Sequence, residues 1–166
     1  VSNIARVQTS KGGSGTLRAI AINGGATGVI FQYGGTNYWY VNSSGQFVSL
    51  SDSAFGYAAG AGGTIAQGSG SGKATGVTLS KPAGEITMDA ANLNADTTVS
   101  FALTNTKITT GDHVLIQHVS GGTVGSYTVT AVAGASSATV YVRNVTAGNL
   151  AEAIVLKFSV LKGATT

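Results

Sequence analysis

Apolar and polar residues alternate along most of the chain after residue 63. In the run SFALTN, Phe101 and Leu103 fall on one face, and small or polar residues fall on the other. The run AIVLKFSVLKG places Ile154 and Phe158 on one side and Lys157 on the other. A period of two is typical of a strand with one face buried and one face in water. Such runs predict about eight short strands, near 63–67, 76–81, 84–89, 97–105, 112–120, 126–133, 137–146 and 152–162.

Turn-forming sequences separate these runs. TTGD, SGGTVG, AGASS and TAGN combine Gly or Ala with Ser, Thr, Asn or Asp, and residues of this kind favour turns and loops. Short strands with a turn about every 8–12 residues indicate two packed sheets. The sequence therefore predicts an all-β protein with a C-terminal antiparallel β-sandwich, jelly-roll-like, of about eight strands. The one helix candidate, MDAANLNAD at 88–96, has an Asn and Asp content that favours a turn-rich connection.

The first 57 residues carry shorter apolar runs, several of them separated by Gly pairs. Five runs have the composition of strands: NIARVQT, TLRAIAI, GVIFQYG, NYWYVN and QFVSLS. The last two predict a hairpin with Ser43-Ser44-Gly45 as its turn. Short strands bury little apolar surface alone. We therefore expect a small N-terminal β segment that pairs with other copies of itself or with a partner's surface.

Gly, Ala and Ser dominate residues 56–76, which is a linker composition. The chain is therefore predicted to have an N-terminal β docking segment at 1–57, a Gly/Ser-rich hinge or loop at 58–75 and the sandwich at 76–166. Within the hinge, AQGSGSGKATGV nearly matches a phosphate-binding loop, but Gln67 replaces its first Gly and Ala74 replaces its hydroxyl residue. A strand-like run follows Lys73, where a phosphate loop needs a helix. The pattern argues against nucleotide binding, and a hinge predicts that Lys73 is dispensable.

Charge is sparse and scattered along the chain. Charged residues make up 9% of the sequence, against about 25% in an average domain, and the net charge is +3. The Lys and Arg residues form no cluster, which argues against a nucleic-acid surface. No apolar stretch reaches the roughly 18 residues of a membrane span, so we expect neither nucleic acid nor membrane as a partner. The absence of Cys excludes disulfides and thiolate chemistry, and we expect oligomerisation to supply stability instead.

Candidate catalytic and metal-binding groups do not converge in the sequence. His113 and His118 are five residues apart in one predicted strand, which puts them on opposite faces. Glu85 and Asp89 do not form an evident pair of facing carboxylates, which a glycosidase needs, and Asp112 has the setting of a turn residue. No Ser has the strand–turn–helix setting of a hydrolase nucleophile. We therefore predict no catalytic, cofactor-binding or metal site, and no enzyme activity.

Most of the aromatic residues lie in the N-terminal third. Tyr38 and Tyr40 share one face of a predicted strand, and Trp39 points the other way. Exposed aromatic side chains suit a subunit interface or the stacking of a sugar, and a small local core is the third interpretation. The candidate interface residues are Phe31, Tyr33, Tyr38, Trp39, Tyr40 and Phe47.

Four motifs of the C-terminal segment carry a resemblance to a known class of module. They are GGTIAQ at 62–67, TGVTLSKPAGEITM at 75–88, VSFALTN at 99–105 and AEAIVLKFSVLKG at 151–163. Together they resemble a β-sandwich module of bacteriophage structural proteins, over about residues 60–165. The resemblance implies a structural or attachment role on the virion surface, and it brings no catalytic residues with it.

The size of the chain favours one virion role over the others. At 166 residues the chain has no room for the shaft and attachment region of a tail fibre, so the expected role is that of a small capsid decoration (cement) protein. The resemblance implies that such a protein binds the major capsid protein or other virion proteins on the capsid exterior, commonly as a homotrimer. The alternative is a receptor-binding tip of a tail fibre or head fibre, which binds a host glycan or protein through loops such as 105–112 and 120–126. A polysaccharide depolymerase is a third alternative, and it requires convergent carboxylates.

Overall fold

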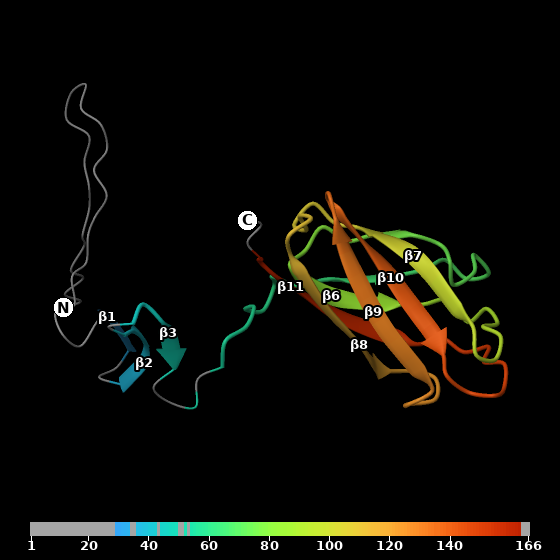
Figure 1. Ribbon diagram of the computed structural model, residues 1–166, viewed down its shortest axis with the longest axis horizontal. Helices are drawn as coiled ribbons and strands as arrows, with labels where there is room; N and C mark the ends of the chain where they lie inside the picture. Colours follow the sequence, from blue (N-terminus) through green and yellow to red (C-terminus); the bar gives the residue numbers. More distant parts are fainter. Residues whose placement is uncertain (1–28, 34–35, 43, 50–51, 53, 164–166) are drawn as a thin grey trace, which may run out of the picture. The chain divides into compact units, whose positions relative to one another are not determined.

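A computed structural model describes residues 29–33, 36–42, 44–49, 52 and 54–163 of the chain. The chain divides into two compact units, Val1–Phe55 and Gly56–Thr166. Each unit has its own β-structure, a small sheet in the first and two larger sheets in the second (Figure 1).

The N-terminal unit contains a three-stranded antiparallel sheet. Its strands are β1 (Val29–Tyr33), β2 (Thr36–Val41) and β3 (Phe47–Ser49), in the order β1-β2-β3. Asn42 closes the β2–β3 turn, because its Oδ1 accepts hydrogen bonds from the backbone N–H groups of Ser44 (3.0 Å) and Gln46 (2.9 Å). Gly45 supplies the positive φ of 76° in this turn. The predicted hairpin is confirmed, while Ser43 and the two strand-like runs before residue 29 lie outside the described residues.

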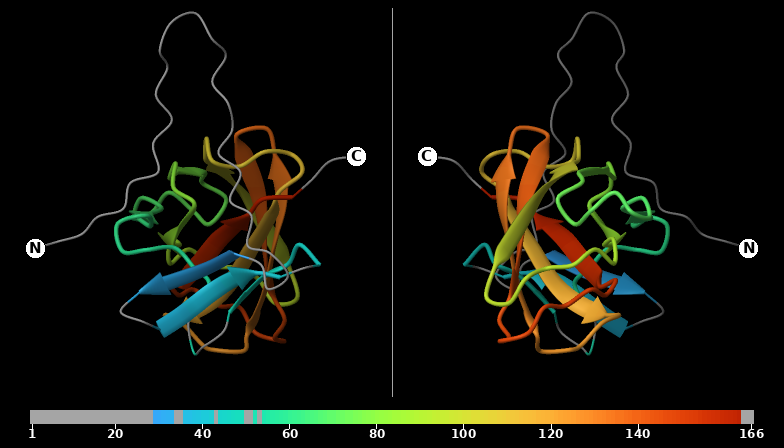
Figure 2. Two further views of the ribbon diagram at one scale, coloured as in Figure 1. Left: turned by 90° about the vertical axis from the view of Figure 1, so that its left-hand side faces the viewer. Right: turned by 90° about the vertical axis from the view of Figure 1, so that its right-hand side faces the viewer.

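The C-terminal unit is a β-sandwich of two four-stranded sheets that pack face to face (Figure 2). One sheet has the order β4-β6-β11-β8, and the other has the order β5-β7-β10-β9. The strands are β4 (Thr64–Ala66), β5 (Val77–Thr78), β6 (Ala83–Thr87), β7 (Thr98–Thr104), β8 (His113–Ser120), β9 (Tyr127–Gly134), β10 (Ser137–Asn144) and β11 (Val155–Leu161). Each coincides with one of the eight strand-like runs of the sequence. The prediction of an all-β fold with an eight-stranded sandwich is confirmed.

Two strand pairs differ from the predicted antiparallel arrangement. β4 runs parallel to β6, and β5 runs parallel to β7. The other ladders of the sandwich are antiparallel. In each parallel pair the chain passes through the other sheet before it returns, so no direct hairpin forces the two strands into opposite directions.

The core lies between the sheets and is built from the inward faces of the alternating strands. In β10, Val140 and Val142 are fully buried, whereas Tyr141 between them is 40% exposed. The largest fully enclosed apolar side chains are Phe158, Ile86, Met88, Leu103, Ile108, Ile154, Leu156, Val140 and Val142. Removal of this apolar surface from water is the main favourable term in the folding of the sandwich.

The hinge predicted at 58–75 belongs to the sandwich. The second compact unit begins at Gly56, β4 pairs with β6 inside it, and Lys73 is almost completely buried. The hydroxyl of Tyr57 already donates a hydrogen bond to the backbone carbonyl of Val160. Short side chains suit a tight loop that packs on a sheet as well as they suit a linker, and residues 67–76 form such a loop. The boundary between the two units therefore falls at Phe55 and Gly56.

The connection at 88–96 is irregular, as its Asn and Asp content suggests. It makes one isolated bridge, between Leu93 and Leu150. The residues that the structure describes include no helix long and apolar enough to cross a membrane.

Candidate functional site

The described aromatic side chains of the N-terminal unit are in mutual contact. The strand register places Phe31 of β1 opposite Trp39 of β2. The ring of Phe47 stacks on that of Trp39 with centroids 5.0 Å apart, and it meets Phe31 edge-on at 5.8 Å. Phe55, which follows the sheet, makes a further edge-on contact with Trp39 at 6.1 Å. Phe31, Trp39, Phe47 and Phe55 are together called the aromatic cluster.

The aromatic cluster is largely exposed among the residues that are described. Phe31 and Phe47 are 51% and 50% exposed, and Phe55 is 77% exposed. Trp39 is half-buried in contact with Phe47 and Phe55. Exposed phenyl rings in contact with one another form a contiguous apolar patch, and such patches on proteins mark interaction surfaces.

The structure brings together three of the six predicted interface residues, namely Phe31, Trp39 and Phe47. The other three are tyrosines whose backbones lie in β1 and β2 and whose side chains are outside the described residues: Tyr33, Tyr38 and Tyr40. The sequence pattern missed Phe55 as a member of this surface. It follows the last strand, so no strand period marks the face to which it contributes.

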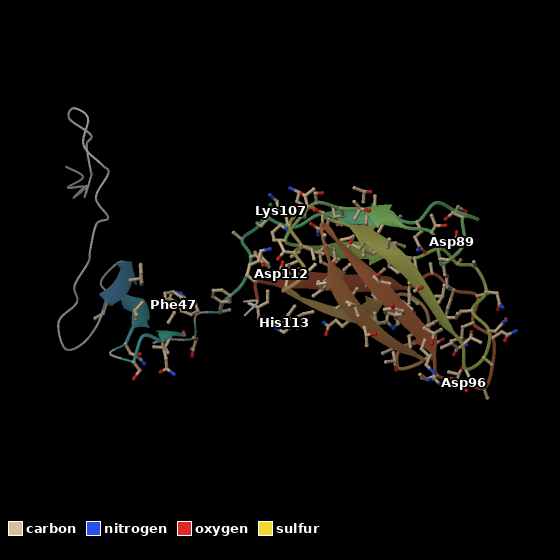
Figure 3. All side chains as sticks on the ribbon, turned by 45° about the horizontal axis from the view of Figure 1, so that its top comes forward. Phe47, Asp89, Asp96, Lys107, Asp112 and His113 are labelled. Carbon is tan, nitrogen blue, oxygen red and sulfur yellow. The ribbon has the colours of Figure 1, made fainter. Side chains whose placement is uncertain are left out.

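The loops of the sandwich lie at its two opposite ends. The end of the sandwich opposite Tyr57 is called the far end, and the end beside Tyr57 is called the near end. The far end carries the loops 67–76, 88–97, 121–126 and 145–154. The near end carries 79–82, 105–112 and 135–136, together with Tyr57 and the end of β11. Figure 3 shows Asp89 and Asp96 at the far end, and Lys107, Asp112 and His113 at the near end. The loops 105–112 and 120–126 precede and follow β8, so they lie at opposite ends and do not form one binding site.

A buried lysine joins three loops of the far end. Lys73 is 3% exposed, and its Nζ donates hydrogen bonds to the backbone carbonyls of Asp89 (2.6 Å) and Glu152 (2.7 Å). These bonds are charge-assisted and are therefore stronger than bonds between neutral groups. Burial lowers the pKa of Lys73, and the nearby carboxylates of Asp89 and Glu152 oppose that shift.

Gln67 closes the loop that contains Lys73. Its Nε2 donates to the carbonyls of Lys73 (2.9 Å) and Thr75 (2.7 Å), and its Oε1 accepts from the N–H of Asp89 (2.9 Å). The carboxylate of Asp89 accepts a further bond from the N–H of Gly70 (2.6 Å). The loop 67–76 is thus attached to the sandwich along its length.

Glu152 connects the loop 121–126 to the same set of residues. Its carboxylate accepts hydrogen bonds from the N–H of Thr123 (2.6 Å) and the hydroxyl of Tyr127 (3.0 Å). The bond from the Thr123 N–H lowers the pKa of Glu152, and burial raises the pKa of Tyr127. Gly121 has a φ of 70°, and a Cβ at this position would lie 2.7 Å from the carbonyl oxygen of Ala153. The two loops therefore approach closely enough to require glycine.

Four side chains thus link all four loops of the far end, and they are called the far-end network: Gln67, Lys73, Asp89 and Glu152.

The near-match to a phosphate-binding loop has a structural explanation. The Nζ of Lys73 is bound to two carbonyls and buried, so it is not presented to an anion. β5 follows the loop, and the described residues provide no helix N-terminus to face a phosphate. Lys73 anchors a loop, and its interpretation as a dispensable hinge residue does not fit its burial.

The two histidines lie on opposite faces of β8, as the sequence predicts. His113 is exposed, and the ring of His118 lies edge-on to that of Tyr127 at 5.5 Å. The Nε2 of His118 is also within hydrogen-bond distance of the carbonyls of Ser120 (2.9 Å) and Gly121 (2.7 Å). His118 therefore stabilises the turn that leads into the loop 121–126.

Asp112 closes the near end in a similar way. Its buried carboxylate lies 2.6 Å from the Nζ of Lys162 and accepts hydrogen bonds from the N–H groups of Thr109 (2.8 Å) and Gly163 (3.3 Å). The bond from Lys162 is the largest of the effects that lower the pKa of Asp112 to about 2. The turn setting that the sequence predicts for Asp112 is confirmed, and its partner Lys162 is one that local sequence does not indicate.

The described residues form no evident catalytic constellation. They contain no group of three or more His, Asp or Glu side chains able to hold a metal ion. Glu85 forms an ion pair with Lys157, with 3.4 Å between Oε1 and Nζ. Two surface hollows of the sandwich have volumes of about 440 Å³ and 390 Å³, and no carboxylate lines either of them. A glycosidase needs two carboxylates beside its cleft, so neither hollow fits a polysaccharide depolymerase.

Comparison of the chain with protein-family models, with curated protein sequences and with solved structures finds no match.

Proposed function

We propose that this chain is a structural protein of the bacteriophage virion surface, and that it acts as a capsid decoration protein. The observation that carries the proposal is the exposed aromatic cluster, because it lies on a small sheet in a unit separate from the well-packed sandwich. The proposal also draws on the resemblance of residues 60–165 to a module of phage structural proteins. It assigns no catalytic step to the chain.

The N-terminal sheet is the part suited to docking. Its three strands have five, six and three residues. A sheet needs a second layer to cover its apolar face, and small isolated sheets are marginal in water. A capsid protein or sister chains in a homotrimer provide that layer, so docking buries Phe31, Phe47 and Phe55 and completes the fold of the unit.

The sandwich is suited to the role of a stable outward body. It has a closed core of its own, and hydrogen-bonded side chains anchor its loops at both ends. Such a body remains folded whether or not the N-terminal unit has docked. A cement protein needs this division, because it must persist free in solution before it binds to the capsid.

Quantitative mass spectrometry and cryo-electron microscopy of purified particles test the proposal. We expect the chain in stoichiometric amounts on the capsid exterior. Phe47→Ser is expected to abolish binding to capsids that lack the protein. The matched control is Val124→Ser, which also removes an exposed apolar side chain (80% exposed) but at the far end, and it is expected to bind normally. Absence of the chain from the capsid, or equal binding of the two variants, contradicts the proposal.

The far end favours a second candidate function, that of a receptor-binding fibre tip. Its four loops are held together by the far-end network, and a preorganised surface loses less entropy when it binds a ligand. The exposed side chains of these loops include the amides of Asn92 and Asn94 and the apolar tip residue Val124. The same pair of variants separates the two functions. A receptor-binding tip predicts that Val124→Ser reduces binding on a glycan array or to host cells, while Phe47→Ser does not.

A further inference from the structure

The near end of the sandwich brings together three lysines that are far apart in the sequence. The side-chain amide of Asn105, which is 0% exposed, donates to the backbone carbonyl of Lys81 (2.8 Å) and accepts from the backbone N–H of Lys107 (2.9 Å). The Nζ of Lys162 donates to the backbone carbonyl of Lys107 (2.6 Å). These bonds hold the backbones of Lys81 and Lys107 together beside the end of β11. The scattered basic residues of the sequence gave no sign of this group.

The positive charge of this group is only partly neutralised. Lys162 pairs with the buried carboxylate of Asp112. Lys81 and Lys107 are exposed, and within the part of the chain that the structure describes they form no ion pair. The two other exposed basic side chains of that part each pair with an acidic residue. The near end, where Figure 3 places Lys107 and Asp112, therefore carries two positive charges that have no acidic partner in the described chain.

The smaller of the two surface hollows lies at this group. Its volume is about 390 Å³, which is within the range of small-ligand sites, and its lining residues are Tyr57, Pro82, Thr106, Lys107, Val160 and Lys162. An ammonium group has three donors, and Lys162 uses two of them on the carbonyl of Lys107 and the carboxylate of Asp112. Asp112 itself does not line the hollow. An anionic group that enters the hollow therefore meets two lysines and no acidic side chain in the wall.

Tyr57 gives the hollow a fixed aromatic wall. Its hydroxyl donates a hydrogen bond to the carbonyl of Val160, while the residue as a whole is 48% exposed. An aromatic ring held at its polar end offers an apolar surface to a ligand. Pro82 adds a second rigid ring to the lining, and the hydroxyl of Thr106 makes no hydrogen bond within the described chain. Apolar rings, an open hydroxyl and an unpaired ammonium group together complement a sugar ring that carries an acidic group.

We infer that this hollow binds an acidic saccharide, with a sugar ring against Tyr57, its carboxylate at Lys107 and a sugar hydroxyl at Thr106. An acidic peptide has the same charge, but peptides are commonly bound along a sheet edge or in an elongated groove. The hollow is instead a single concavity with six lining residues. The site lies entirely on the sandwich, so it does not depend on the proposed virion role or on docking by the N-terminal sheet.

Calorimetric titration of the full chain with trigalacturonic acid tests the inference. Lys107→Gln is the informative variant, because the contacts of Lys107 within the described chain are made by its backbone and survive the substitution. We expect it to weaken binding by about three- to fivefold. Lys157→Gln is the matched control, since it removes the same charge at the other hollow, about 16 Å along an extended strand from Lys162. Charges this far apart are largely screened, so the control is expected to bind like the unmodified chain.

Two further probes separate the charge of the ligand from its sugar ring. The methyl ester of trigalacturonic acid keeps the rings and removes the charge, and it is expected to bind at least about threefold more weakly than the acid. A triglutamate peptide with both ends capped keeps three carboxylates and has no sugar ring, so it is also expected to bind more weakly. Absence of binding by the acid, equal binding of the acid and its ester, or equal losses in the two lysine variants overturns the inference. Tighter binding of the peptide than of the saccharide overturns it as well, in favour of an acidic protein segment.

Discussion

The N-terminal sheet and the C-terminal sandwich are built from the same kinds of residue but expose them differently. In the sandwich, Phe101 and Phe158 are 3% and 1% exposed. In the N-terminal unit, Phe31, Phe47 and Phe55 are at least half exposed. The difference lies in the number of layers, because the sandwich has a second sheet to cover its apolar face and the described N-terminal strands do not.

This comparison separates two uses of an apolar face. A face that meets another layer of the same chain stabilises the fold, whereas a face left open in a separate unit is available to a partner. In the role proposed above, the sandwich provides the stability and the aromatic cluster provides the docking surface.

The largest expected effect comes from removing a phenyl ring in each region. Phe158→Ala leaves a cavity in the closed core and is expected to cost about 3–5 kcal/mol of unfolding free energy. Phe47→Ala removes an exposed ring and is expected to change the stability of the sandwich by less than about 0.5 kcal/mol. Hydrogen exchange of the β10 amides reports the sandwich alone and measures both effects. A large loss from Phe47→Ala would show that the N-terminal sheet is part of the folding unit of the sandwich.

A smaller loss is expected from Lys73→Met. The substitution keeps the aliphatic stem but leaves two buried carbonyls without their donor, at a cost of about 2–4 kcal/mol. Lys81→Met is the control, because Lys81 is exposed and its loss is expected to stay within about 0.5 kcal/mol. Urea unfolding of both variants provides the comparison. If the two substitutions have equal effects, the loop 67–76 is not anchored by Lys73, and the hinge interpretation returns.

The smallest predicted effect is a dependence of stability on pH at the near end. The pKa of Asp112 is about 2 in the folded chain, below its ordinary value of 3.8. Its contribution is therefore complete above about pH 4 and is lost as the pH falls toward 2. The lowered pKa of Glu152 acts in the same direction. Asp112→Asn is expected to flatten the decline in unfolding free energy between pH 4 and 2, and so is Lys162→Met, which removes the cation. An unchanged slope in both variants contradicts this role of the pair.

Much of the fold could be predicted from the sequence, because alternation is a local signal. Phe101 and Leu103, or Val140 and Val142, mark their buried face by spacing alone. Alternation carries no information on strand direction, so the parallel pairing of β4 with β6 and of β5 with β7 was not predicted.

The features of the candidate site that the sequence missed depend on distant partners. Lys73 is buried by its bonds to carbonyls 16 and 79 residues away, and no local pattern indicates either. Its surroundings of Gly and Ser are the same in a free linker and in a packed loop. Phe55 joins the aromatic cluster from outside any strand, and its side-chain direction follows from the tertiary structure only.

The fluorescence of Trp39 tests the central claim most directly, because it is the only Trp in the chain and lies in the aromatic cluster. The claim is that the N-terminal sheet binds a partner through this cluster while the sandwich stays unchanged. On addition of capsids that lack the protein, we predict that the emission of Trp39 shifts to shorter wavelength and that its quenching by acrylamide decreases. If the chain binds to the particles while the emission and quenching of Trp39 stay as they are in the free protein, another surface makes the contact and the claim is wrong.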